Sequence, residues 1–139
     1  VMGGDFEALW PISDKVARAG ARGGLFHPLT SYSLPDAVRF AAWLAREAPL
    51  DGRLGEATRE RARRHWSRGA YYRLLTAMLY KAADPDKRYR VLQRFYRLRA
   101  PLIGRFYAGE SLLSDKLRIL SGKPPVPLGR ALKVLKEFL

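Results

Sequence analysis

The sequence predicts a mainly α-helical chain that one turn-rich segment interrupts near its start. Over long stretches apolar residues recur every three or four positions, which is typical of amphipathic helices. Proline, glycine and aspartate separate these stretches, as expected of helix ends. The exception is the segment 20–35, where three glycines, two prolines and a histidine interrupt the helical period.

The residues that lead into this segment predict the only strand of the chain. Residues 14–22 alternate loosely around Val16 and Ala19, which favours a short extended element before the turn at residues 20–28. The sequence therefore predicts a strand, then a glycine turn, then a helix.

A first helix is expected over residues 34–48. Ser31 or Ser33 stands near its cap and Pro35 in its first turn. Its apolar positions at helical spacing are Leu34, Val38, Ala41, Ala42 and Ala45. The breaker residues at 49–52 end it.

Five further helices follow along the chain. They are expected at residues 54–83, 87–98, 100–107, 111–120 and 128–139. Gly69 is expected to kink the first of them, and residues 122–127, rich in proline, predict an extended linker.

Composition limits the classes of function. The chain has 26 lysine and arginine residues against 13 carboxylates, a formal net charge of +13, so an anionic partner is expected. It has no cysteine, which excludes disulfides and thiolate metal sites and fits a reducing cytoplasm. No run of about 18 apolar residues is present, so any membrane contact is expected to be peripheral.

The glycine turn predicts one side of a binding site for a phosphate or a cofactor. Glycine lets backbone N–H groups approach a ligand without a β-carbon in the way, and a helix start beyond it adds unpaired donors. The alternative is a tight connection with no ligand.

The same residues carry a family resemblance. The spacing from Gly20 to Pro28, and then to Ser31 and Ser33, resembles the second flavin-binding motif of FAD-dependent hydroxylase-like flavoproteins. The string Gly-Leu-Phe-His-Pro-x-Thr-x-Tyr-Ser-Leu-Pro is similar to the bacterial lycopene β-cyclases, a branch of that superfamily. A second block agrees, at residues 93–96, 105–109 and 115–127.

The resemblance implies the helical C-terminal part of an α/β, FAD/NAD(P)-binding Rossmann-like flavoprotein. Residues 1–48 would end the FAD-binding domain, and residues 49–139 would form a helical region facing substrate and membrane. The implied reaction converts the linear ends of lycopene into β-ionone rings. It is acid-initiated and assisted by reduced FAD without net redox change, with NADPH as the reductant. The principal catalytic acid is expected outside this chain, which by itself would be inactive.

The resemblance also implies a set of cofactor-binding residues: Gly20, Gly23, Gly24, Pro28, Ser31, Tyr32 and Ser33. Two positions depart from the family pattern. Ala21 stands where an aspartate is common, so no carboxylate is available there for the ribityl hydroxyls. Ser31 stands where glycine is usual, which would crowd the backbone near the flavin.

Histidine is scarce. His27, between Phe26 and Pro28, is a weak candidate for orienting or protonating a group near the flavin. The alternative, which we favour, is a histidine that bonds neighbouring backbone and shapes the turn. His65 lies far along a helix beside no patterned carboxylate, so no metal site is expected.

The stretch 87–105 carries seven basic residues and no acid. Aromatic residues lie among them and in the turn, and we expect these to face substrate or membrane: Phe26, Tyr89, Phe95, Tyr96, Phe106 and Tyr107. A basic face opposite aromatic residues is typical of a helix lying on an anionic membrane. Attachment is expected at the cytoplasmic face. The alternative is that the aromatic residues form the core and the arginines are simply solvated.

The expected partners are therefore lycopene, or a related linear carotenoid, and an anionic membrane surface. Two other functions stay open. One is another FAD-dependent oxidoreductase, such as a monooxygenase or geranylgeranyl reductase, and the other is a basic helical nucleic-acid-binding module. No helix-turn-helix, zinc or RNP-like pattern supports the second, so no nucleic acid is expected.

Overall fold

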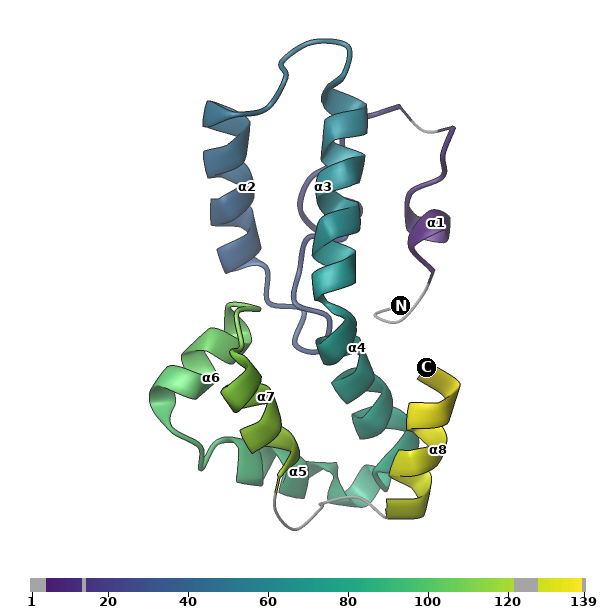
Figure 1. The fold of residues 1–139 in the computed structure, drawn as a ribbon, viewed down its shortest axis with the longest axis vertical. Coiled ribbons are helices and arrows are strands. Elements are labelled where there is room, and N and C mark those ends of the chain that lie inside the picture. The colour runs from purple at the N-terminus through teal and green to yellow at the C-terminus, as the bar shows by residue number, and fades with distance from the viewer. Residues whose placement is uncertain (1–4, 14, 122–127, 139) are drawn as a thin grey trace. The chain divides into compact units, whose positions relative to one another are not determined.

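The computed structural model describes residues 5–13, 15–121 and 128–138, which fold almost entirely as helices and turns (Figure 1). The chain forms two compact units, Val1–Tyr71 and Tyr72–Leu139. The expected division at residues 48 and 49, which rests on function, stays a prediction. Each unit is described by itself below.

The first unit contains a short helix and two long ones. These are α1 (Phe6–Leu9), α2 (Leu34–Arg46) and α3 (Leu54–Arg68). A 3-10 turn, Gly20–Gly23, lies between α1 and α2. Helix α4 (Ala70–Ala77) then begins directly after Gly69 and continues into the second unit.

The second unit contains four further helices. They are α5 (Arg88–Phe95), α6 (Ala100–Tyr107), α7 (Leu113–Leu120) and α8 (Leu128–Phe138). A π-helical turn, Met78–Ala82, continues α4, and a 3-10 turn, Pro85–Lys87, leads into α5.

The mainly helical prediction is confirmed for the described residues, and α6 has the predicted bounds. The helix expected over residues 54–83, with a kink at Gly69, is interrupted at that residue: α3 ends there, and the N–H of Gly69 donates to the carbonyl oxygen of His65 at 3.0 Å. Helix α1 was not foreseen. The linker expected at residues 122–127 lies outside the described residues.

The predicted strand at residues 14–22 is wrong for the part that the structure describes. Its end, Gly20–Gly23, is a 3-10 turn, and Val16 is 69% exposed. A strand needs a neighbouring extended segment to satisfy its ladder hydrogen bonds. No such neighbour exists among the described residues, so loose alternation alone is not enough.

The core of the first unit is built around Trp10. Its ring is fully buried among Phe6, Leu25 and Ala62. The indole Nε1 donates to the carbonyl oxygen of Gly23 at 3.1 Å, so the polar end of the ring is satisfied inside the core. This bond ties the short N-terminal helix to the glycine turn.

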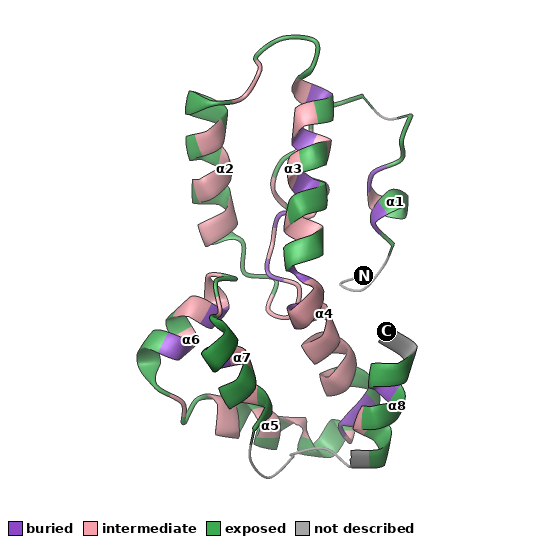
Figure 2. Cartoon of the chain, in the orientation of Figure 1, coloured by how far each residue is buried: buried purple, intermediate pink, exposed green. Residues whose placement is uncertain are grey.

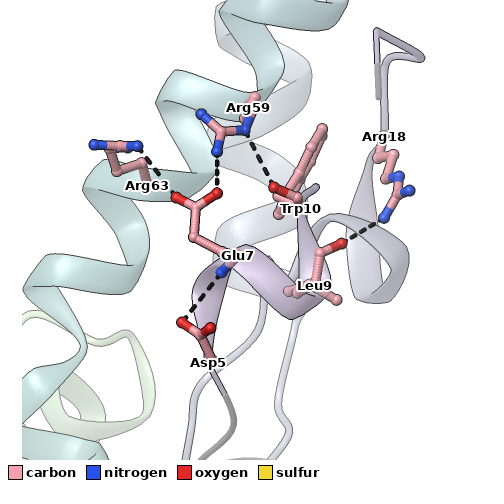
Figure 3. A network of polar contacts seen from close by, with 7 residues as sticks. All are labelled: Asp5, Glu7, Leu9, Trp10, Arg18, Arg59 and Arg63. Carbon is pink, nitrogen blue, oxygen red and sulfur yellow. Dashed lines mark hydrogen bonds and ion pairs between the residues drawn. The ribbon is translucent and has the colours of Figure 1, made fainter. Parts of the chain in front are cut away.

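Arginines of α3 hold α1 through one carboxylate (Figure 3). Glu7 accepts from Arg59 at 2.5 Å and from Arg63 at 3.3 Å. The Arg59 Nε also donates to the carbonyl oxygen of Trp10 at 3.3 Å. These contacts join residues about 50 positions apart, and they orient α3 over the core.

Helix α2 packs with a face that the sequence did not predict. Leu34 and Val38, which belong to the expected apolar stripe, are 59% and 60% exposed. The half-buried residues are instead Phe40 and Trp43, and Arg61 of α3 stacks over the Trp43 ring at 4.9 Å. Burial lowers the pKa of Arg61, whose fork also donates to the carbonyl oxygen of Arg39.

The second unit has an aromatic core. Tyr72 and Phe106 are both 3% exposed and meet edge to face with ring centres 5.4 Å apart. Helix α8 packs on the π-helical turn, where Val134 is buried and Arg130 pairs with Asp84 at 2.5 Å. In Figure 2, α6 and α8 each carry a short buried stretch, drawn in purple, among half-buried and exposed residues.

Within the described residues, no helix has the length and apolar character needed to cross a bilayer.

A close backbone approach at Gly55 gives the first testable prediction. A β-carbon there would lie 1.7 Å from the carbonyl oxygen of Lys15. We expect Gly55→Ala to lower the free energy of unfolding by about 2–3 kcal/mol, since backbone must move to admit the methyl group. Chemical denaturation of the purified protein measures this.

The matched control is Gly104, which also lies in a helix but has open space around its missing side chain. Gly104→Ala should raise stability by about 0.5–1 kcal/mol, through helix propensity alone. Equal effects of the two changes would contradict the close approach.

Candidate functional site

The glycine turn is stabilised from within. The N–H of Gly24 donates to Ala21 at 3.1 Å and that of Leu25 to Gly20 at 3.0 Å. Gly24 has a φ of +70°, a backbone conformation that favours glycine, and a β-carbon there would lie 2.6 Å from Leu9 Cδ2, so the Leu9 side chain would have to move. The glycines therefore have a structural reason that is independent of any ligand.

His27 is buried and shapes the segment. Its Nδ1 accepts from the N–H groups of Leu29 and Thr30, both at 3.3 Å. The backbone N–H of His27 donates to the carbonyl oxygen of Tyr32, and the backbone carbonyl oxygen of His27 accepts from the N–H of Ser31. Because Nδ1 is an acceptor, the neutral ring carries its proton on Nε2. This is the turn-shaping role that the sequence favoured, while a catalytic role of His27 stays a prediction.

The exposed part of the segment lies just before α2. Ser31 has a φ of +59°, the left-handed region that favours glycine, and this conformation fits the glycine that the family resemblance implies at this position. Tyr32 and Ser33 are exposed, Pro28 is half-buried, and Ser33 forms the N-cap of α2. Of the expected cofactor set, Ser31, Tyr32 and Ser33 are thus accessible in this unit.

His65 links Phe26 in the turn-rich segment to Asp36 in the first turn of α2, which corrects the expectation that it stands apart from carboxylates. Its Nε2 bonds the carbonyl oxygen of Phe26 at 3.1 Å, and its Nδ1 lies 3.5 Å from Asp36 Oδ1. Asp36 also accepts from Arg39 at 2.9 Å. His65 therefore holds the backbone of Phe26, whose side chain is half-buried.

Two parts of the second sequence block contact each other in the second unit. Arg105 donates two hydrogen bonds to the carboxylate of Asp115, both at 2.7 Å. Asp115 Oδ2 also accepts from the N–H of Leu112 at 3.0 Å, at the start of α7. The Arg105 hydrogen bonds hold the pKa of Asp115 below its usual range. The turn between α6 and α7 is further fixed by Ser111, whose N–H donates to the Tyr72 hydroxyl at 3.0 Å.

The expected substrate-facing aromatic residues divide by exposure. Phe106 is a core residue, with Phe95 half-buried against it at a ring distance of 4.7 Å. Tyr89 and Tyr96 are 56% and 57% exposed. The alternative that aromatics form the core is therefore right for Phe106, while two tyrosines remain on the surface.

A pair of phenols connects α6 to the residue that ends α5. The hydroxyls of Tyr96 and Tyr107 are 2.5 Å apart. This hydrogen bond, together with partial burial, raises the pKa of Tyr107 to about 12. The phenol is therefore neutral across the physiological range and is a donor or acceptor of hydrogen bonds rather than an anion.

Sequence reasoning missed an exposed row of leucines on α7. Leu113, Leu117 and Leu120 share one face of α7 by their spacing and are 73%, 60% and 46% exposed. The signal that was available is Asp115, which the helical period places on the opposite side from them.

Among the described residues no three histidine or acidic side chains gather as a metal site.

Comparison with known proteins assigns the chain to a class. The sequence model of the lycopene cyclase protein family matches residues 1–133. The chain belongs to this family. No solved structure matches it.

Individual relatives agree. The chain is 52% identical to the lycopene beta-cyclase of Pseudescherichia vulneris over 132 residues, which are 94% of this chain and 34% of that protein. It is 45% identical to the lycopene beta-cyclase of Pantoea ananas over 96% of this chain and 35% of that protein. The chain thus spans about a third of the length of these curated relatives. The comparisons favour the cyclase interpretation over the other flavoprotein and nucleic-acid interpretations.

The ion pair of Arg105 and Asp115 gives a prediction on pH. Asp115→Asn should lower the melting temperature at neutral pH, because the carboxylate that accepts two hydrogen bonds from the Arg105 guanidinium is lost. The pKa of Asp115 is depressed in the folded state, so its stabilisation is present above the ordinary value of 3.8 and is lost as the pH falls through the depressed value. The difference between parent and variant should therefore shrink only below pH 3.8.

Asp51→Asn is the matched control, since Asp51 also binds an arginine, Arg53, but its side chain is 51% exposed. An exposed pair contributes little, so this change should leave the melting temperature almost unaltered. Similar losses for both variants would mean that Asp115 has no special anchoring role.

Proposed function

We propose that the gene product containing this chain is a lycopene β-cyclase, which closes the linear ends of lycopene into β-ionone rings. The observation that carries the proposal is family membership over residues 1–133, with relatives of that name at 45–52% identity. The substrate would be lycopene or a related linear carotenoid.

The segment before α2 would form one edge of an FAD site. Ser31, Tyr32 and Ser33 are exposed and lead into the N-terminus of a 13-residue helix, whose partial positive charge suits an anionic or electron-rich group. His65 and Asp36 hold this segment from behind, so its shape is fixed before a ligand binds. The reduced flavin, supplied with electrons by NADPH, would stabilise positive charge that develops on the substrate.

Two described carboxyl groups have little exposure, and an arginine holds each of them. This supports a catalytic acid that lies elsewhere in the gene product. Asp115 is held by Arg105 and Asp36 by Arg39. The hydrogen bonds from Arg105 lower the pKa of Asp115, which makes it a poor proton donor. Asp36 already accepts from Arg39 and lies beside His65, so we assign neither of them the initiating protonation.

The second unit would attach the protein to a membrane at its cytoplasmic face. The basic stretch 87–105 contains Arg90, Arg97 and Arg99, all exposed, and has no acidic residue. Tyr89 and Tyr96 lie on the same exposed surface of α5 or just beyond its end. Cationic and aromatic residues in this arrangement suit an anionic lipid surface.

The test of the activity is expression of the complete gene product in a bacterium that accumulates lycopene. We expect cyclic carotenoids to appear in extracts separated by chromatography, and FAD to remain with the purified protein. Loss of lycopene without cyclic products would favour a different flavoprotein activity, and unchanged lycopene would contradict the proposal.

Gly20 offers the sharpest variant at the cofactor edge. Valine at Gly23 or Gly24 would meet Arg18 or Leu9 and disturb folding whatever binds there. A β-carbon at Gly20 meets nothing within 4 Å, but its φ of +53° lies in the left-handed region, which a branched side chain does not tolerate. Asparagine tolerates this region, so Gly20→Asn should lower the flavin content of the folded protein, by obstructing backbone approach, more than it lowers stability. Flavin content equal to the parent would place the cofactor elsewhere.

Membrane attachment predicts a local charge effect. Neutralising Arg90, Arg97 and Arg99 together to glutamine should weaken binding to phosphatidylglycerol vesicles about a hundredfold, at about 1 kcal/mol for each charge. Arg94 is left intact because it donates to the carbonyl oxygen of Ser121. Co-sedimentation at low ionic strength measures the change.

The charge-matched control neutralises Arg22, Arg46 and Arg64, which are exposed in the first unit. It removes the same net charge and should affect binding much less. Equal losses for the two triple variants would show that only the overall charge matters.

A further inference from the structure

Helix α7 has its polarity reversed relative to an ordinary surface helix. Its acidic residue, Asp115, points inward and is 4% exposed, because Arg105 and the N–H of Leu112 bind it. Its leucine stripe, which we define as Leu113, Leu117 and Leu120, is 46–73% exposed. A helix that buries its carboxylate and displays its leucines is built to meet an apolar environment on its outer side.

Helix α5 and the residue after it carry a second exposed stripe in the same unit. Tyr89, Leu92 and Tyr96 recur at helical spacing and are 56%, 47% and 57% exposed. Arg94 donates to the carbonyl oxygen of Ser121, just after α7, so the C-terminal ends of the two helices lie together. Figure 2 shows most of α7 as exposed. The two stripes therefore belong to neighbouring helices of the same unit.

The charge around this surface is strongly positive. Residues 72–139 have 15 lysines and arginines against five carboxylates, a formal net charge of +10 out of +13 for the whole chain. Two of the five carboxylates, Asp84 and Asp115, are bound to arginines. The second unit therefore combines exposed leucines and tyrosines with a large excess of cations.

We propose that the leucine stripe of α7 inserts into the acyl boundary of an anionic bilayer. Tyr89 and Tyr96 would lie at the level of the headgroups, where amphipathic rings are favoured, and arginines such as Arg90 would pair with lipid phosphates. Leucines gain nothing from a nucleic-acid backbone. A high density of cations also disfavours the centre of a protein interface, where charged residues are depleted.

This inference rests on the proposed membrane attachment and identifies which element enters the lipid. The arginine stretch alone would leave the protein on the headgroups. The leucine stripe adds burial of three apolar side chains, and it makes attachment depend on hydrophobic insertion as well as on charge.

The absence of cysteine from the chain allows a direct test. In the complete gene product, with any other cysteine replaced, Leu117→Cys carries an environment-sensitive fluorophore. The matched control is Val38→Cys on α2, because Leu117 and Val38 are apolar helical residues that are both 60% exposed. The probes are vesicles of phosphatidylglycerol and phosphatidylcholine that contain brominated lipid, and vesicles of phosphatidylcholine alone.

We expect the label at position 117 to be quenched by brominated lipid in the anionic vesicles, and the label at position 38 to be quenched much less. Failure of the thiol at 117 to react in the folded protein without vesicles would overturn the inference, because another part of the protein would then cover the stripe. Equal quenching at the two positions would overturn it as well.

A second measurement separates the two proposals. Changing Leu113, Leu117 and Leu120 together to serine should weaken binding to the anionic vesicles about a hundredfold, with an unchanged melting temperature. Undiminished binding of this variant would overturn insertion of α7 and leave attachment by the arginines standing. Absence of binding by the parent protein would overturn both.

Discussion

The contact of Arg105 with Asp115 is the constraint on which the second unit depends. One carboxylate accepts both donors of a guanidinium fork and also caps the start of α7, so the ends of α6 and α7 and the turn between them are fixed together. Bidentate geometry of this kind is specific as well as strong. The consequence is an orientation of α7 that places its leucines outside.

In the first unit, too, single carboxylates bind more than one partner. With half as many acids as bases, the chain places its acids where one can hold several partners. Glu7 binds two arginines of α3, and Asp36 lies beside both Arg39 and His65. Several arginines that hold the fold also stack on aromatic rings, such as Arg61 on Trp43. The remaining arginines are left for the surface.

Local signals in the sequence predicted much of this fold. The bounds of α6 follow from Pro101 in its first turn and Gly109 just after its end, both of which act on neighbouring residues only. The strand at residues 14–22 was wrong because a strand depends on a partner that its own residues do not specify. The orientation of α7 was missed for a similar reason: the helical period places Asp115 opposite the leucines, but the partner that buries Asp115 lies across a turn on another helix.

In the candidate site, too, local features could be predicted from the sequence and long-range contacts could not. The composition predicts the glycine turn, and the family resemblance makes Ser31 an unusual residue, whose backbone is left-handed in the structure. The role of His65 was missed, because its contact with Phe26 spans 39 positions of sequence. Contacts of that length leave no periodic trace. The residues that support the site were thus harder to find than those that form it.

The choice of arginine around α5 has a consequence for control of the protein in the cell. Every basic residue of α5, namely Arg88, Arg90 and Arg94, is a guanidinium, which stays protonated at any physiological pH. None of these charges can be removed by acetylation, a modification of lysine. Under the proposed attachment, the contribution of these three charges would not respond to cytoplasmic acidity. It would follow the fraction of anionic lipid, so for these residues control would lie in the composition of the membrane.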